Sequence, residues 1–72
     1  MDDLNYMIEY MSRDLVLLLM ERQDLDMEEA LNTLYNSETY TKLTDPRTGF
    51  YFQSPLYVYD FLEKELLIGK ME

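Results

Sequence analysis

Apolar residues recur at helical spacing over the first third of the chain. The residues that share one broad stripe are Leu4, Met7, Ile8, Met11, Leu15, Leu18 and Leu19. We expect a helix that begins at Asp2 or Asp3, where a carboxylate caps the first turn, and ends near Gln23.

The opposite side of this helix is apolar as well. Its second stripe comprises Tyr6, Tyr10 and Leu17, with Met20 beside it and Arg13 in its gap. A helix that is apolar on two sides is either central in a fold or shared with another molecule. In so short a chain a central helix is hard to cover all round, so the second stripe favours contact with another molecule.

A second helix is predicted from Met27 to about Asn36. The spacing of Asp26 and Glu29 is that of a capping box, with Asp in place of Ser or Thr. The residues on its apolar face are Met27, Ala30, Leu31, Leu34 and Tyr35. This pattern places Leu31 and Leu34 in the core.

The middle of the chain is less regular. Ser37 can cap a short piece from Glu38 to Leu43, for which the pattern leaves helix and strand both open. Thr44 to Arg47 reads as a turn, and Gly49 supplies a positive φ if the bend needs one. Phe50 to Gln53 is expected to be extended, with Phe50 and Phe52 on one side and Tyr51 on the other.

A last helix is predicted to start at Ser54 and Pro55, a capping hydroxyl followed by proline at the first helical position. Its core-facing residues are expected to be Tyr57, Val58, Phe61, Leu62 and Ile68. Glu65 interrupts that stripe, so we expect the end of the Glu65 side chain to be exposed to solvent. Gly69 would stop the helix, and Lys64 and Lys70 suit its negative end.

These elements predict an all-α fold: one small three-to-four-helix domain over residues 1–72, with a short extended segment near Phe50–Gln53. The chain has a net charge of −9 and contains neither cysteine nor histidine. Disulfides, thiolate ligands and the commonest general base are therefore excluded, which leaves association as the way to reinforce a small core. Because nucleic-acid binding needs a basic face, no direct contact with DNA or RNA is expected.

The sequence also bears on location. Its N-terminus is acidic, unlike a signal peptide, and the longest apolar run, Leu15 to Met20, is far shorter than the ~20 residues that span a bilayer. We expect no membrane contact and a cytoplasmic protein.

No residue pattern indicates catalysis, a cofactor or a metal. The acids from Asp24 onward do not fit a calcium loop, because the sixth and twelfth positions are Glu29 and Tyr35. Ser37 and Ser54 lack a histidine to activate them and are placed as helix caps. We therefore expect a protein that is not an enzyme.

Residues 34–62 resemble a family of short uncharacterised bacterial proteins through the pattern LYNSxTYxKLxDxxTGxYxQSPxYVYxxL. The resemblance implies no known activity, cofactor or catalytic residue. Small acidic proteins of this kind often lie beside toxin-like genes, so the resemblance favours an antitoxin-like or adaptor role.

The leading hypothesis is a non-enzymatic protein–protein interaction module that forms a homodimer and can bind another protein with a basic surface. Tyrosine combines a large rigid area with a hydrogen-bonding tip, which favours it at interfaces, although the same residues could build a small core. The candidate interface residues are Tyr6, Tyr10, Arg13, Leu17, Tyr51, Tyr57 and Tyr59.

The alternative is an acidic, antitoxin-like inhibitor of a basic protein or nucleic-acid-binding site. It predicts one continuous acidic patch, formed by Glu9, Glu21, Asp24, Asp26 and Glu28.

Overall fold

Residues 3–68, the part of the chain that the computed structural model describes, form helices joined by short turns. The elements are α1 (Asp3–Arg22), α2 (Met27–Tyr35), α3 (Glu38–Leu43), the 3₁₀ turns η1 (Pro46–Thr48) and η2 (Phe50–Phe52), and α4 (Pro55–Ile68). This confirms the predicted all-α fold. The roles expected of Asp2, Gly69 and Lys70 lie outside the described residues.

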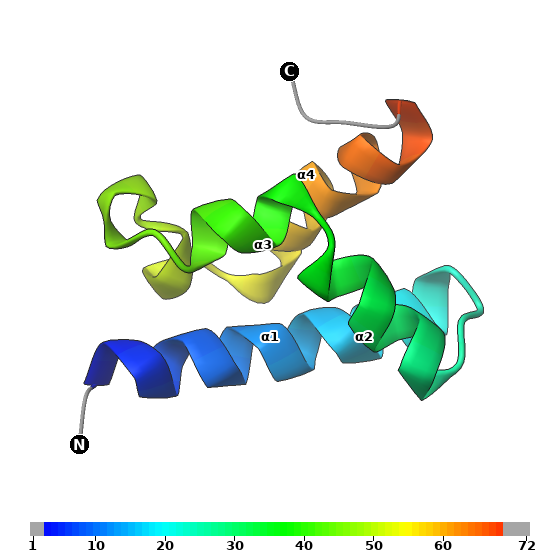
Figure 1. The fold of residues 1–72 in the computed structure, drawn as a ribbon, viewed down its shortest axis with the longest axis horizontal. Helices are drawn as coiled ribbons and strands as arrows, with labels where there is room; N and C mark the ends of the chain where they lie inside the picture. Colours follow the sequence, from blue (N-terminus) through cyan, green and yellow to red (C-terminus); the bar gives the residue numbers. More distant parts are fainter. Residues whose placement is uncertain (1–2, 69–72) are drawn as a thin grey trace.

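The long helix α1 forms one side of the molecule, and α2, η2 and α4 pack along its inner face (Figure 1). After a short turn, α2 lies against α1, while η2 and α4 cover the rest of that face. Helix α3 packs against α4 and does not lie directly on α1 (Figure 1). None of the helices between residues 3 and 68 has the length and apolar character needed to span a bilayer.

The core is made of aliphatic side chains from all four helices, with Tyr59 and Phe50 among them. Its fully buried members are Leu15, Leu19, Ala30, Leu34, Leu43, Val58 and Leu62. The predicted core positions Leu34 and Leu62 are confirmed, whereas Leu31 and Phe61 are half-buried against the cluster.

Side-chain caps fix where the helices begin, as the sequence indicated. The capping box of α2 is complete: Asp26 Oδ1 accepts the Glu29 N–H at 2.8 Å, and Glu29 Oε1 accepts the Asp26 N–H at 3.0 Å. Ser37 Oγ accepts the Tyr40 N–H at 3.0 Å, and Ser54 Oγ accepts the Tyr57 N–H at 3.1 Å. The cap at Ser37 resolves the open choice for residues 38–43 in favour of helix.

The expected extended segment near Phe50–Gln53 is instead the turn η2. Gly49 has φ 73°, as the bend required, and its carbonyl accepts the Phe52 N–H at 3.3 Å. An isolated strand has no partner among residues 3–68, whereas a tight turn satisfies its own backbone. The turn buries Phe50 and leaves Phe52 61% exposed, so the two rings do not share a side as predicted.

The prediction for Glu65 is also wrong, because its side chain is buried. Glu65 Oε2 accepts the Glu38 N–H at 2.8 Å, and Oε1 accepts the Thr39 N–H at 3.0 Å and the Thr39 hydroxyl at 2.8 Å. The carboxylate thus satisfies two of the free N–H groups that begin α3. Ile68, predicted to face the core, is 66% exposed in the last turn of α4.

Candidate functional site

The second stripe lies on the outer face of α1, opposite the core residues Leu15 and Leu19. Its residues Tyr6, Tyr10 and Leu17 are 50%, 48% and 52% exposed. About half of each side chain is exposed, so this face of α1 is open to another molecule, and Leu17 also lines a hollow with Pro55 and Leu56 of α4.

The two tyrosines of the second stripe are ordered by each other. The Tyr6 hydroxyl donates to the Tyr10 hydroxyl at 3.1 Å, and the rings meet edge to face with centroids 4.8 Å apart. This hydrogen bond, with the nearby Tyr10 charge, raises the pKa of Tyr6. The Arg13 guanidinium lies 5.6 Å from the Tyr10 ring centroid, a cation–π contact. The stripe is therefore a pre-arranged aromatic and cationic surface.

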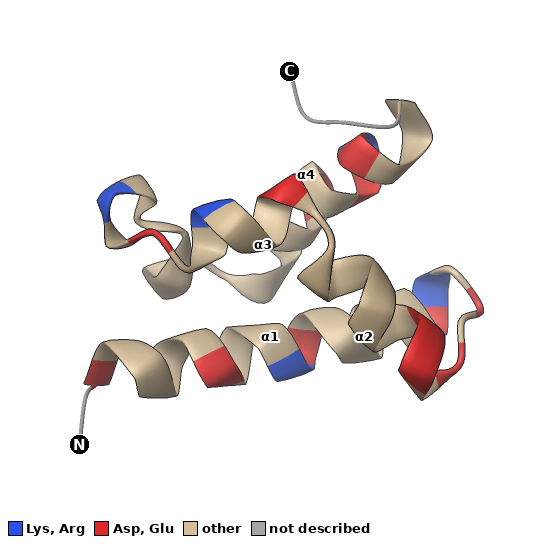
Figure 2. Ribbon diagram, in the orientation of Figure 1, with Lys and Arg blue, Asp and Glu red and all other residues tan. Residues whose placement is uncertain are grey.

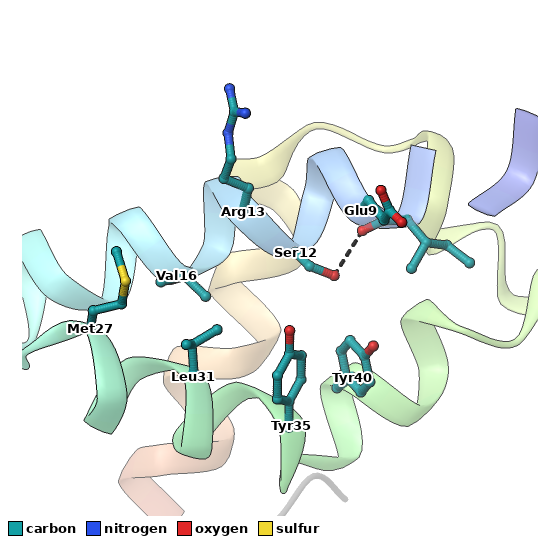
Figure 3. Close-up of a pocket in the computed structure, with 9 residues that line it drawn as sticks. Glu9, Ser12, Arg13, Val16, Met27, Leu31, Tyr35 and Tyr40 are labelled. Atoms are coloured by element: carbon teal, nitrogen blue, oxygen red, sulfur yellow. Dashed lines mark hydrogen bonds between the residues drawn. The ribbon is translucent and has the colours of Figure 1, made fainter. Parts of the chain in front are cut away.

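A mostly apolar surface groove of about 280 Å³ runs along the line where α1 and α2 meet (Figure 3). Helix α3 closes one end of this groove. We call it the α1–α2 groove. Its lining residues are Ile8, Glu9, Ser12, Arg13, Val16, Met27, Leu31, Tyr35 and Tyr40.

Two rows of side chains spaced four residues apart build the walls of this groove. The row on α1 is Ile8, Ser12 and Val16, and the row on α2 is Met27, Leu31 and Tyr35. Residues four apart lie on one face of a helix, so each row forms a continuous ridge. The Ser12 hydroxyl donates to the Ile8 carbonyl at 2.7 Å, so the donor of the one polar residue in this row is satisfied within α1 (Figure 3).

Glu9 and Arg13 form the border between the α1–α2 groove and the second stripe. Both also line a smaller hollow with Tyr6 and Tyr10. The Arg13 side chain points away from the groove in Figure 3, in keeping with its contact to Tyr10.

The other predicted interface tyrosines do not join the second stripe. Tyr59 is only 2% exposed, and its hydroxyl accepts a hydrogen bond from Gln23 Nε2 at 3.0 Å, so its assignment to the interface is wrong. The Arg22 guanidinium covers the same ring at 5.7 Å. Tyr51 is half-buried, and Tyr57 is 47% exposed with its ring 5.3 Å from that of Phe61.

The sequence pattern does not predict the α1–α2 groove. It places Met27 and Tyr35 on the apolar face of α2, yet these side chains are 57% and 54% exposed. Two features of the sequence, taken together, indicate the groove. The apolar face of α2 is wider than one neighbouring helix can cover, and side chains on α1 recur at the same four-residue spacing.

The acidic residues do not form one continuous patch. Figure 2 shows acidic segments around the turn between α1 and α2, but also along α1 and on α4, while the basic residues of α3 and η1 lie at the other end of the molecule from that turn. Glu9 is twelve positions from Glu21 along α1, which is roughly 18 Å in a helix. No group of three or more carboxylates within residues 3–68 is arranged to hold a metal ion.

No protein-family model, no curated protein and no solved structure matches this chain. The resemblance of residues 34–62 to short bacterial proteins remains a prediction.

Proposed function

We propose that this protein is a non-enzymatic interaction module that associates with itself through the second stripe. The observation that carries the proposal is the open outer face of α1, where Tyr6, Tyr10 and Leu17 are each about half exposed. The same surface on a second copy can cover it across a two-fold axis, which is the commonest way in which soluble proteins self-associate.

The charges beside the second stripe support a pair of copies. The ion pairs within residues 3–68 join Arg47 to Asp45 and Lys64 to Asp60, so Arg13 forms none there. Its guanidinium is available to a ring or a carboxylate of the second copy.

Arg13 also favours one orientation. In a parallel pair of α1 helices it would face its own copy, and two like charges would meet near the axis. In an antiparallel pair it can face Tyr10 of the second copy and repeat the contact that it already makes within its own chain. We therefore propose an antiparallel pair of α1 helices.

Light scattering tests the association. The wild type is expected to show the mass of a dimer at high micromolar concentration, more so at moderate than at low salt, because salt screens the repulsion between chains of charge −9. Leu17→Lys should be monomeric, whereas the matched control Leu67→Lys, which changes another exposed leucine, should behave as the wild type. A wild-type monomer at both salt concentrations would rule out the proposal.

Crosslinking tests the orientation, since the chain has no cysteine of its own. A register that sets Arg13 against Tyr10 of the second copy also sets Tyr6 against Leu17 of that copy. Mixed Tyr6→Cys and Leu17→Cys proteins should then form a disulfide between the two variants on oxidation. Disulfides within each single variant, and none between them, would indicate a parallel pair.

The second candidate is an acidic, antitoxin-like inhibitor of a basic site. It draws support from the acids around the turn between α1 and α2 (Figure 2), but Glu9 lies apart from them, so the continuous patch that this function predicts is not formed. The nearby Arg22 guanidinium lies over the Tyr59 ring. This function predicts that tagged protein purified from its native host carries one basic protein. Asp24→Lys and Glu28→Lys should release that protein, and Leu17→Lys should retain it. Recovery of the chain with itself alone would favour the self-associating module.

A further inference from the structure

The α1–α2 groove has the shape that a third helix fills in a helical bundle. Each wall runs over nine residues, Ile8 to Val16 on α1 and Met27 to Tyr35 on α2, which is about 12 Å of helix. That length matches roughly two turns of a bound helix, with anchors at i, i+3, i+4 and i+7. Because no strand occurs within residues 3–68, this surface offers no sheet edge to an extended peptide.

The floor and walls of the groove are suited to apolar anchors. Leu31 is half-buried at its centre, and Met27 is 57% exposed at one end. At the other end the rings of Tyr35 and Tyr40 meet with centroids 5.0 Å apart. The free tips of these tyrosines supply polar groups at the margin of an otherwise apolar surface.

The margins of the groove carry negative charge from both helices. Glu9 lies on the α1 side. Glu28 precedes Leu31 by three positions and Tyr35 by seven, so it follows the same side of α2. Neither carboxylate forms an ion pair within residues 3–68. Arg13, the one cation that lines the groove, points away from it over Tyr10 (Figure 3).

We infer that the α1–α2 groove binds an amphipathic helix of another protein, whose apolar stripe is flanked by lysine or arginine. The apolar residues of that helix pack between Val16 and Leu31, and its cations meet Glu9 and Glu28. This site is distinct from the second stripe and does not require self-association. The two surfaces share only the border formed by Glu9 and Arg13.

Two designed peptides serve as probes. Each is a helix of about 14 residues, or four turns, with leucine at i, i+3, i+4 and i+7. One carries lysine at its polar positions, and the other carries glutamate. Binding is followed by the amide resonances of the Leu17→Lys protein, so that contact between copies through the second stripe does not interfere.

The lysine peptide is expected to shift the resonances of Ser12, Leu31 and Tyr35 and to bind at least about tenfold more tightly than the glutamate peptide. Its affinity should fall with added salt, opposite to the salt dependence expected for self-association. Met27→Lys should weaken binding by about tenfold or more, because it removes an apolar contact and adds a like charge. The matched control Leu67→Lys should leave the affinity unchanged.

Three results would overturn this inference. They are equal affinity for the two peptides, shifts that map away from the groove, and no shift at about millimolar concentration, the weak end of specific binding. A fourth would reassign the surface: if Met27→Lys dissociated wild-type dimers and left peptide binding intact, the groove would belong to the second copy. The first three results can be read whether or not the protein self-associates through the second stripe, so the two proposals fail separately.

Discussion

At the scale of single residues, the Tyr6–Tyr10 hydrogen bond has a measurable consequence. Donation from the Tyr6 hydroxyl stabilises its neutral form and raises its pKa above the ordinary value. The contribution to stability is therefore complete below the unfolded-state pKa and is lost as the pH rises through the folded-state value. Tyr10→Phe should return the Tyr6 pKa toward its ordinary value, as measured by the carbon resonances of the ring. An unchanged titration of Tyr6 in Tyr10→Phe would contradict the assigned bond.

Asp24 is the one residue other than glycine with a positive φ, at 57°, within residues 3–68. It lies two positions beyond α1, where glycine is the usual residue, and its carboxylate sits at the negative end of the helix dipole. Asp24→Gly should match or exceed the wild type in stability, and Asp24→Ala should be less stable than Asp24→Gly by about 1 kcal/mol. Urea unfolding measures the difference. Equal midpoints for the glycine and alanine variants would show that this backbone is unstrained.

At the scale of elements, α3 depends on a residue of α4. Its six residues are too few to form a stable helix alone, and the Glu65 carboxylate accepts two of its first N–H groups. In Glu65→Gln one carboxylate oxygen becomes an N–H₂ donor, which leaves an N–H of α3 without an acceptor and should cost about 1–3 kcal/mol. The matched control, Glu63→Gln, makes the same charge change two positions earlier on α4 and should have little effect. Chemical unfolding followed by circular dichroism compares the two, and equal losses would exclude a capping role.

The elements also show which features the sequence can predict. Helix starts at Asp26, Ser37 and Ser54 were predictable because each cap bonds within its own first turn. The burial of Glu65 was not, because its partners at the start of α3 lie 26 and 27 positions away. When a polar residue interrupts an apolar stripe, the local sequence does not show whether its side chain is exposed to solvent or caps the N-terminus of another helix.

The turn η2 illustrates a related limit. Alternating aromatic residues favour a strand only if another strand can pair with them, and this chain supplies none within residues 3–68. Gly49 was the local indication of a bend, but periodicity over four residues cannot distinguish a strand from a 3₁₀ turn.

At the scale of the whole molecule, one small core holds the four helices together. Leu34 is fully buried at its centre. Leu34→Ala should cost about 2–5 kcal/mol, which is comparable with the roughly 3–5 kcal/mol that a core of this size supplies. Leu67→Ala, at a leucine that is 79% exposed, should leave the melting temperature unchanged. A Leu34→Ala protein that melts with the wild type would contradict this description of the core.

A surface feature formed by one helix could be predicted from the sequence, whereas a feature formed between two helices could not. The second stripe follows from the periodicity of α1 alone, and its exposed tyrosines and Leu17 agree with that reading. The α1–α2 groove depends on the angle between two helices, which no single pattern encodes. For the same reason Tyr59 was misassigned: its burial depends on Gln23 and Arg22 from the far end of α1.

The bond between Glu65 and α3 also constrains the order in which the chain can fold. Helices α1 and α2 are neighbours in sequence, each has its own start signal, and their contacts close only a short loop. Helix α3 follows them in sequence and has the local cap Ser37, yet Glu65, the acceptor of its first two N–H groups, arrives only when α4 has docked. We therefore expect the amide hydrogens of Glu38 and Thr39 to become protected from exchange together with those of α4 and later than those of α1. The middle of this chain would then acquire its structure only together with its last helix.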